Sequence, residues 1–192
     1  MSPVACTAAL WALLALLATA CGPVPAGQAL DLHPEIADPA VIASFKDTAV
    51  GTVARADART FTLKTPEQRD ALHERIEKER YIWRTTGPEN YRFLLRTQCF
   101  CPGVRGWLLI EVRRNQPLRA WDRTGKAAQL RDWDTFSIDQ LFDNLDISAA
   151  SNPTVQVGFD PALHFPAYAY TTASQLPDTW SIIEVRGLKP MR

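Results

Sequence analysis

The first strong periodic pattern in the chain is that of an amphipathic helix. Thr65-Pro66-Glu67-Gln68 forms a capping box with Pro at the first helical position, and Gly87-Pro88 supplies the stop. Between these signals, apolar residues recur on one face: Leu72, Ile76 and Trp83. The pattern predicts a helix of about twenty residues from Thr65, supported on its solvent side by the pairs Glu74–Lys78 and Arg75–Glu79.

Beyond Gly87 the pattern changes to the alternation of half-buried strands. The first strand places its apolar residues on one face and Arg92, Arg96 and Gln98 on the other; the apolar face holds Tyr91, Phe93, Leu95 and Thr97. Strands over 107–114 and 118–123 follow, and the short link Asn115-Gln116-Pro117 predicts a hairpin. Ahead of the first helix, residues 48–53 and 60–64 are expected to form a short hairpin of their own.

A second helix is predicted to open at Ser137, with Gln140 completing the cap and Phe136 stapled onto Leu141. Its apolar stripe is Ile138, Leu141, Phe142 and Leu145. Three more strands are expected over 154–159, 167–172 and 180–185. The order of helix, three strands, helix and three strands, with short links, predicts an α+β fold: an antiparallel sheet with helices packed on one face.

The N-terminal segment is typical of an export signal. The first 20 residues hold no charged residue, and Val4 to Ala20 is mainly apolar, yet shorter than the roughly 20 residues that span a bilayer. Leu17-Ala18-Thr19-Ala20-Cys21 resembles the bacterial lipobox, whose cysteine takes a diacylglycerol and becomes the new N-terminus. We therefore expect a signal peptide over 1–20, a lipidated N-terminus and tether over 21–30, and one α+β domain over 31–192. The alternative is ordinary cleavage near Ala20 with Cys21 left as a thiol.

Charge and processing bear on the expected partners. The chain has 21 Lys and Arg against 21 Asp and Glu, without a basic block, so net charge indicates neither nucleic acid nor electrostatic attraction to an anionic membrane. The expected membrane contact is the lipid on Cys21, and the protein or small-molecule partner is not indicated. The expected location is the cell envelope; Gly22 rather than Asp after the cysteine favours the periplasmic face of the outer membrane in a Gram-negative host.

Cys99 and Cys101 are the remaining free cysteines of the expected processed chain, because Cys6 leaves with the signal peptide and Cys21 carries the lipid. On a continuous strand their Cα atoms would lie about 6.6–6.8 Å apart, at the upper edge of disulfide geometry. An oxidising compartment favours a local disulfide with a shape-fixing role. A redox-active pair, metal ligands and free buried thiols are the alternatives.

Other constellations predict no catalytic or metal site and no cofactor. His33, His73 and His164 are not spaced as metal ligands on one element and are expected to be isolated surface or turn histidines. The acidic run from Asp132 to Asp146 lacks the glycine and oxygen positions of a calcium loop and is expected to be a solvated loop and helix face. Motifs for nucleophilic, phosphate-binding and zinc chemistry are missing from the sequence.

Several spaced motifs together resemble an uncharacterised family of bacterial lipoproteins, domain of unknown function 6174. The resemblance spans roughly Leu72 to Val185, and its most specific part is an aromatic strand that leads into Cys99-Phe100-Cys101. The chain differs at His164-Phe165-Pro166, where the family tends to have Gly-Tyr-Pro, and at Thr179, where an acidic residue is common. The other matching positions are Trp83, Tyr91-Arg92-Phe93, Ser137 to Phe142, Val157 to Asp160, and Asp178. The resemblance implies a secreted or lipid-anchored domain and no particular activity.

These observations favour a lipid-anchored bacterial envelope protein that acts as a non-enzymatic binding or interaction module. The alternative is a thiol-disulfide redox protein that uses Cys99 and Cys101; an enzyme of another kind comes third.

We predict that Cys21 is acylated, because small residues precede it and a Pro- and Gly-rich tether follows. Mass spectrometry of membrane-extracted protein should find a modified N-terminal Cys21; an unmodified Cys21 or a different N-terminus would contradict the prediction. The variant Cys21→Ser should move to the soluble fraction. If it remains with the membrane, Val4 to Ala20 is an uncleaved anchor.

We also predict that Cys99 and Cys101 are bonded to each other and contribute little to global stability. A loop of three residues constrains the unfolded chain by roughly 1.6 kcal/mol at most, and strain opposes this gain. Peptide mapping without reductant should find one peptide blocked to alkylation. A Cys99→Ser/Cys101→Ser variant should unfold within about 2 kcal/mol of the parent. Free thiols, or a much larger loss of stability, would contradict the prediction.

Overall fold

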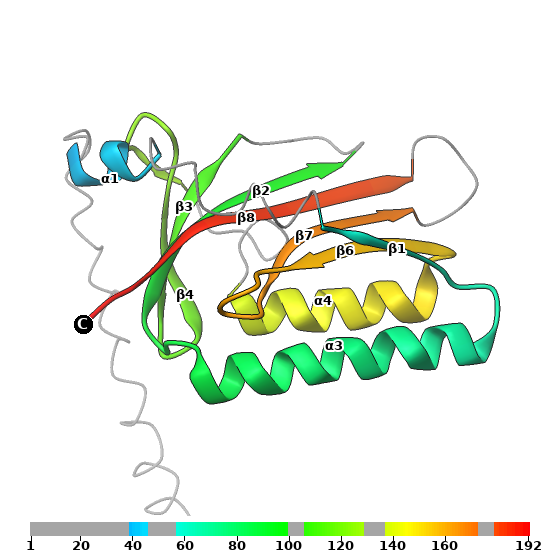
Figure 1. Ribbon diagram of the computed structural model, residues 1–192. Coiled ribbons are helices and arrows are strands. Elements are labelled where there is room, and N and C mark those ends of the chain that lie inside the picture. The colour runs from blue at the N-terminus through cyan, green and yellow to red at the C-terminus, as the bar shows by residue number, and fades with distance from the viewer. Residues whose placement is uncertain (1–38, 46–56, 100–105, 129–136, 173–178) are drawn as a thin grey trace, which may run out of the picture. The chain divides into compact units, whose positions relative to one another are not determined.

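An eight-stranded antiparallel sheet with two long helices on one of its faces forms the fold (Figure 1). The computed structural model describes residues 39–45, 57–99, 106–128, 137–172 and 179–192. The strands lie in the order β1-β6-β7-β8-β2-β3-β4-β5. Their bounds are Arg59–Thr62 (β1), Tyr91–Cys99 (β2), Leu108–Arg113 (β3), Gln116–Trp121 (β4), Ala127–Ala128 (β5), Thr154–Phe159 (β6), Pro166–Thr172 (β7) and Trp180–Pro190 (β8). The helices are Pro39–Ser44 (α1), Pro66–Thr86 (α3) and Ile138–Ser151 (α4).

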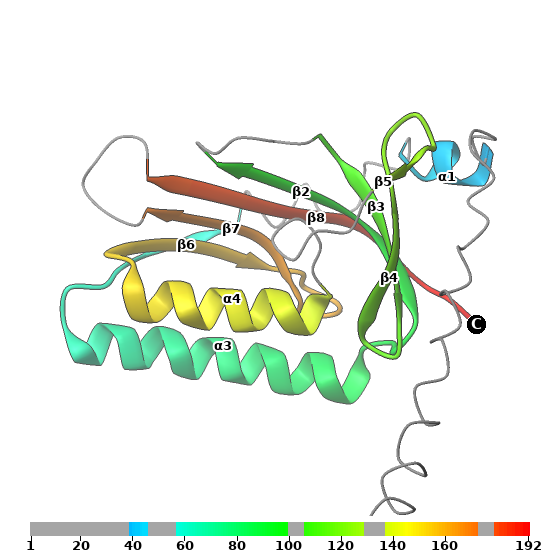
Figure 2. The same cartoon turned by 180° about the vertical axis from the view of Figure 1, so that it is seen from behind.

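This architecture confirms the predicted α+β class, and α3 and α4 lie side by side on the same face of the sheet (Figures 1 and 2). Both predicted capping boxes are present. The Gln68 amide N–H donates to the Thr65 hydroxyl at 3.4 Å, and the Gln68 side chain accepts from the Thr65 N–H at 3.1 Å. Ser137 and Gln140 make the corresponding pair of bonds at the start of α4. Each box satisfies amide groups that a helix terminus leaves without an intrahelical partner.

The predicted stop of α3 depends on a close approach of the chain to Trp83. A Cβ atom on Gly87 would lie 2.6 Å from the Trp83 carbonyl oxygen and 2.7 Å from its ring. Only glycine fits there, and the Gly87 N–H donates a hydrogen bond to the Trp83 carbonyl oxygen at 2.6 Å. The chain can therefore turn directly from α3 into β2.

The main core lies between the sheet and the two helices. Trp83 is in edge contact with Tyr91 and with Phe165, at ring-centroid distances of 5.5 and 6.0 Å. The predicted stripes of both helices are buried in this core, as are three of the four predicted inward residues of β2; the fourth, Thr97, is only partly buried. The core members include Leu72, Ile76, Tyr91, Phe93, Leu95, Ile138, Leu141, Phe142 and Leu145.

Charged residues join α3 to α4 and correct the expectation of a solvated face for Asp139 and Asp146, whereas the Asp143 side chain is 61% exposed, as expected. Arg80 is 9% exposed and its guanidinium lies 2.5 Å from the Asp146 carboxylate. Arg84 bonds to Asp139, and the His73 ring bonds to the other Asp146 oxygen. Helical spacing predicts which charged residues share one face of a helix. It does not predict that this face packs against another helix, which depends on the fold.

The strand predictions need smaller corrections. The β3–β4 hairpin turns at Arg114 and Asn115, both with positive φ, so Gln116 and Pro117 belong to β4 rather than to the link. Two left-handed residues give the turn the twist of a two-residue hairpin. The strand β8 extends to Pro190, and the short strand β5 adds to β4. The expected partner of β1, residues 48–53, lies outside the described residues, and β1 pairs with β6. Phe136 also lies outside them.

A bulge in β8 determines which residues reach each face of the sheet. Leu94 pairs with Arg186 and Arg92 with Lys189, so one extra residue of β8 lies between the two pairs. Gly187 absorbs it with a φ of 58°, a conformation that glycine adopts without penalty. Without this extra residue, Val185 and Leu188 would point to opposite faces, yet both are buried in the main core.

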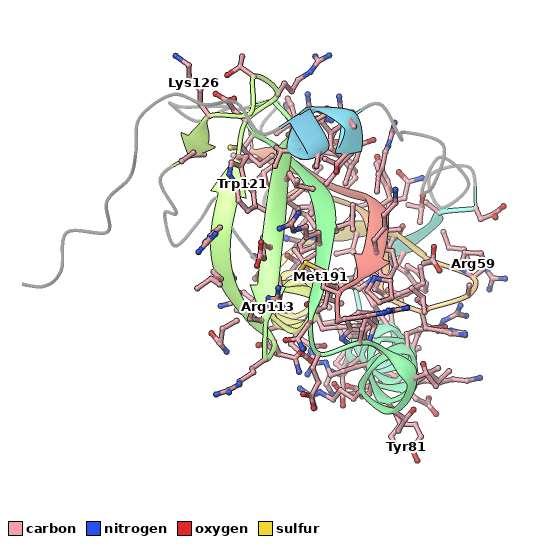
Figure 3. The ribbon with its side chains drawn as sticks, turned by 90° about the vertical axis from the view of Figure 1, so that its left-hand side faces the viewer. Arg59, Tyr81, Arg113, Trp121, Lys126 and Met191 are labelled. Atoms are coloured by element: carbon pink, nitrogen blue, oxygen red, sulfur yellow. The ribbon has the colours of Figure 1, made fainter. Side chains whose placement is uncertain are left out.

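The opposite face of the sheet carries a second, small apolar cluster. Val41 of α1 packs there against Leu94 and Leu109. Figure 3 shows α1 near Trp121, with Tyr81 of α3 at the far end of the view. None of the described helices is long and apolar enough to cross a membrane.

Tyr91 provides a test of how the sheet and α4 are joined. Its buried hydroxyl accepts a hydrogen bond at 2.9 Å from the amide N–H of Ile138, the first residue of α4. Burial raises the pKa of the Tyr91 phenol, so the group stays protonated. Tyr91→Phe leaves that N–H buried and unpaired and should cost about 1–3 kcal/mol of unfolding free energy in urea denaturation.

The matched control is Tyr81→Phe, because the Tyr81 residue is 70% exposed. This variant should stay within about 0.5 kcal/mol of the parent. Equal stability of the two variants would show that the Tyr91 bond contributes nothing.

Candidate functional site

A polar cavity lies between α3 and the β1–β6 edge of the sheet, on the helix side. It has a volume of about 240 Å³, and its walls include Arg59, Phe61, Arg75, Glu79, Phe159 and His164. Figure 3 shows Arg59 at this edge, across the sheet from Trp121. The cavity therefore combines residues that lie up to about a hundred positions apart in the chain.

Glu79 is the central acidic group of this cavity. It lies on the inward side of α3 and is 5% exposed. Its Oε1 lies 2.8 Å from Arg75 Nε, one helical turn earlier, in an ion pair, and its Oε2 lies 2.6 Å from His164 Nδ1. Both oxygens of a buried carboxylate thus have polar partners, as a buried charge requires.

His164 is positioned by the turn between β6 and β7. The Asp160 side chain accepts the amide N–H groups of Ala162 and Leu163, at 3.0 and 2.8 Å. The His164 N–H closes the turn by donating to the Asp160 carbonyl at 2.9 Å. This arrangement is an Asx turn, a local motif that needs no further support from the sheet.

The backbone of His164 is in a strained conformation. Its φ is 63°, in the left-handed region that costs a non-glycine residue of order 1 kcal/mol. The resemblance described above implies Gly at this position, and the observed φ is the conformation that Gly adopts freely. Histidine here is strained, but its ring gains the bond to Glu79.

The bond to Glu79 orients the imidazole. A carboxylate beside Nδ1 favours the tautomer in which Nδ1 carries the proton and Nε2 is an acceptor. Within the described part of the chain, Nε2 has no hydrogen-bond partner, and the His164 side chain is 33% exposed. The ring can therefore accept a hydrogen bond from a bound group, or donate one when it is protonated.

The rest of the wall is mixed in character. The Arg75 guanidinium lies 5.8 Å from the centre of the Phe159 ring, which in turn stacks on Phe142. Phe61 and Val157 add apolar surface, and Arg59 adds a second guanidinium. This combination of a few fixed polar groups on an apolar floor is typical of ligand sites.

The predicted site residues are not part of this cavity. Cys99 ends β2 and pairs in register with Ser181 of β8. Cys101 and Cys21 lie outside the described residues, so the disulfide and the lipidation remain predictions. Among the described residues, no cluster of three or more His, Cys, Asp or Glu could hold a metal ion.

For two residues of the cavity, the structure differs from what the sequence predicts. The pair Arg75–Glu79 is confirmed, but Glu79 is buried rather than on the solvent side. His164, expected to be isolated, is bonded to it. The two residues are 85 positions apart, so spacing along the chain could not connect them. The one local signal was that the resemblance implies glycine where this chain has His164.

Comparison with known families gives one finding that agrees with the resemblance seen in the sequence. The model of a family of unknown function, DUF6174, matches residues 75–176, which is more than half of the chain. The match includes both Glu79 and His164. No curated protein matches the chain.

Proposed function

The chain belongs to the DUF6174 family, and from this premise we propose that it is a lipid-anchored bacterial envelope protein whose α+β domain is a non-enzymatic binding module. The lipobox-like segment before Cys21 supports the anchor. The observation that carries the binding role is the Glu79–His164 pair, which fixes an imidazole at the wall of a polar cavity.

The orientation of His164 favours recognition. A carboxylate that orients a histidine also occurs in catalytic triads, but there the second ring nitrogen faces a nucleophile. The described residues that line the cavity include no Ser, Thr or Cys. A hydrogen bond to a ligand is therefore the simplest use of Nε2.

The size of the cavity limits the ligand. Its volume of about 240 Å³ is below the roughly 300–1,000 Å³ that holds a drug-sized molecule. We propose a small polar molecule, or one polar side chain of a protein partner, that hydrogen-bonds to His164 and lies against Phe159. Because His164 departs from the family pattern, this contact is proposed for this chain and not for the family.

The thiol-disulfide alternative has less support. Cys99 does not line the cavity, and no described observation favours a redox role for it over a local disulfide. A rapidly exchanging Cys99–Cys101 bond with a high reduction potential would reverse this ranking.

The binding role can be tested by an NMR screen with small carboxylic acids, amides and amines as probes. Some probes should shift the ring resonances of His164 together with the amide of Arg59. In His164→Gln the affinity of those probes should fall by about tenfold or more, because the hydrogen bond at Nε2 is lost.

His73→Gln is the matched control, since His73 also bonds to a carboxylate but lies outside the cavity. It should leave probe affinity unchanged. Probes that bind elsewhere, an unchanged affinity in His164→Gln, or no binding at all would each overturn the proposed site.

A further inference from the structure

The charged residues of the domain are separated between its two sides. Every charged residue of β2, β3, β4 and β8 lies on the sheet face opposite α3 and α4, and six are basic against two acidic. We call the six basic residues the arginine face: Arg92, Arg96, Arg113, Arg119, Arg186 and Lys189. In contrast, α3 and α4 together carry eight Asp and Glu against five Lys and Arg. The sequence predicts no electrostatic attraction to a membrane, because the net charge of the whole chain is zero. Net charge does not show how the charges are distributed between the two sides of the domain.

Four cations of the arginine face, Arg92, Arg96, Arg113 and Arg186, are in contact with buried acids or aromatic rings, and Arg119 and Lys189 are exposed. Glu111 bonds to Arg92 and Arg113, and Glu184 bonds to Arg96. The Arg186 guanidinium lies 3.8 Å from the Glu184 carboxylate in a looser ion pair. Burial raises the pKa of the Glu111 carboxyl, but hydrogen bonds from both arginines outweigh it and hold that pKa below its ordinary value. The Glu111 carboxylate therefore stays ionised. The contacts of Glu111 and Glu184 fix the guanidinium groups that they touch, so these arginines lose little side-chain freedom on binding.

Tryptophan rings lie among these guanidinium groups. Arg96 and Arg186 each lie 4.8 Å from the centre of the Trp107 ring, and Arg92 lies 5.4 Å from that of Trp121. Arginine and tryptophan together are typical of surfaces that rest in the headgroup region of a bilayer.

The first helix of the described chain packs on this side of the sheet. The helix α1 is the first described element after Cys21, and Val41 packs on Leu94 and Leu109 of the same face. The 18 residue-to-residue steps from Cys21 to Pro39 can extend at most about 60–65 Å. A lipid on Cys21 would therefore keep the arginine face within reach of the membrane.

We propose that the arginine face docks on the anionic lipid headgroups of the membrane that holds the anchor. The proposed lipidation of Cys21 determines which membrane the domain meets, whereas the attraction to anionic lipid does not depend on it. Net positive charge favours the anionic surface, and the partly buried Trp107 and Trp121 suit its headgroup layer. The acidic helices and the cavity then face away from the membrane.

The test uses the mature chain, residues 21–192, with Cys21→Ser so that no lipid is attached. It should sediment with vesicles of phosphatidylglycerol and phosphatidylcholine in equal parts, and not with pure phosphatidylcholine. Added salt should release it. Because electrostatic docking would hold the Cys21→Ser variant on membranes, its fractionation from cells requires a salt wash. Mass spectrometry of Cys21 tests lipidation independently of docking.

Two exposed cations provide the decisive variant. Arg119→Gln/Lys189→Gln should lower the partition coefficient about 25-fold, because each cation near an anionic surface contributes about fivefold. Lys64→Gln/Lys78→Gln removes the same charge from exposed positions next to and on α3 and should have little effect. Circular dichroism checks that both variants remain folded.

Three outcomes would overturn the proposal. Equal binding to neutral vesicles would exclude an electrostatic surface, and equal losses in the two variants would exclude this face. Binding to polyglutamate but not to anionic vesicles would indicate an acidic protein partner instead.

Discussion

The contact between Trp83 and Tyr91 is the junction on which the fold depends. Trp83 closes α3, Tyr91 opens β2, and the close approach at Gly87 brings the two rings into edge contact. The Tyr91 hydroxyl then accepts the first amide of α4. One buried aromatic pair therefore fixes the place of both helices against the sheet, and with it the side on which the main core forms.

How far the sequence predicts this fold depends on the range of the interactions. Thr65 with Gln68, and Ser137 with Gln140, are three residues apart, so both helix starts could be predicted from local chemistry. The alternation of Tyr91, Phe93 and Leu95 also identified the buried face of β2. The pairing of β1 with β6 joins segments nearly a hundred residues apart, and only the folded chain shows it.

The same limit applies to the candidate site. His164 and Glu79 meet because the β6–β7 turn lies over α3, an arrangement that neither residue's neighbours in sequence indicate. Arg96 and Glu184 are a comparable pair on the other face. In both, a buried carboxylate organises basic groups from distant elements. Net charge and composition cannot predict these arrangements, because both quantities are totals over the whole chain and contain no information on which residues meet.

The separation of charge between the two sides also gives the domain an electric dipole. A neutral molecule feels no net pull in a uniform field, but a dipole feels a torque that turns its positive end towards negative charge. The strands β2, β3, β4 and β8 are that positive end, and α3 with α4 the negative one. Near an anionic surface the domain would therefore rotate before it touches, within about one Debye length, roughly 8–10 Å at physiological salt. Orientation and attachment would then be separate properties, the first set by the fold and the second by the proposed lipid on Cys21.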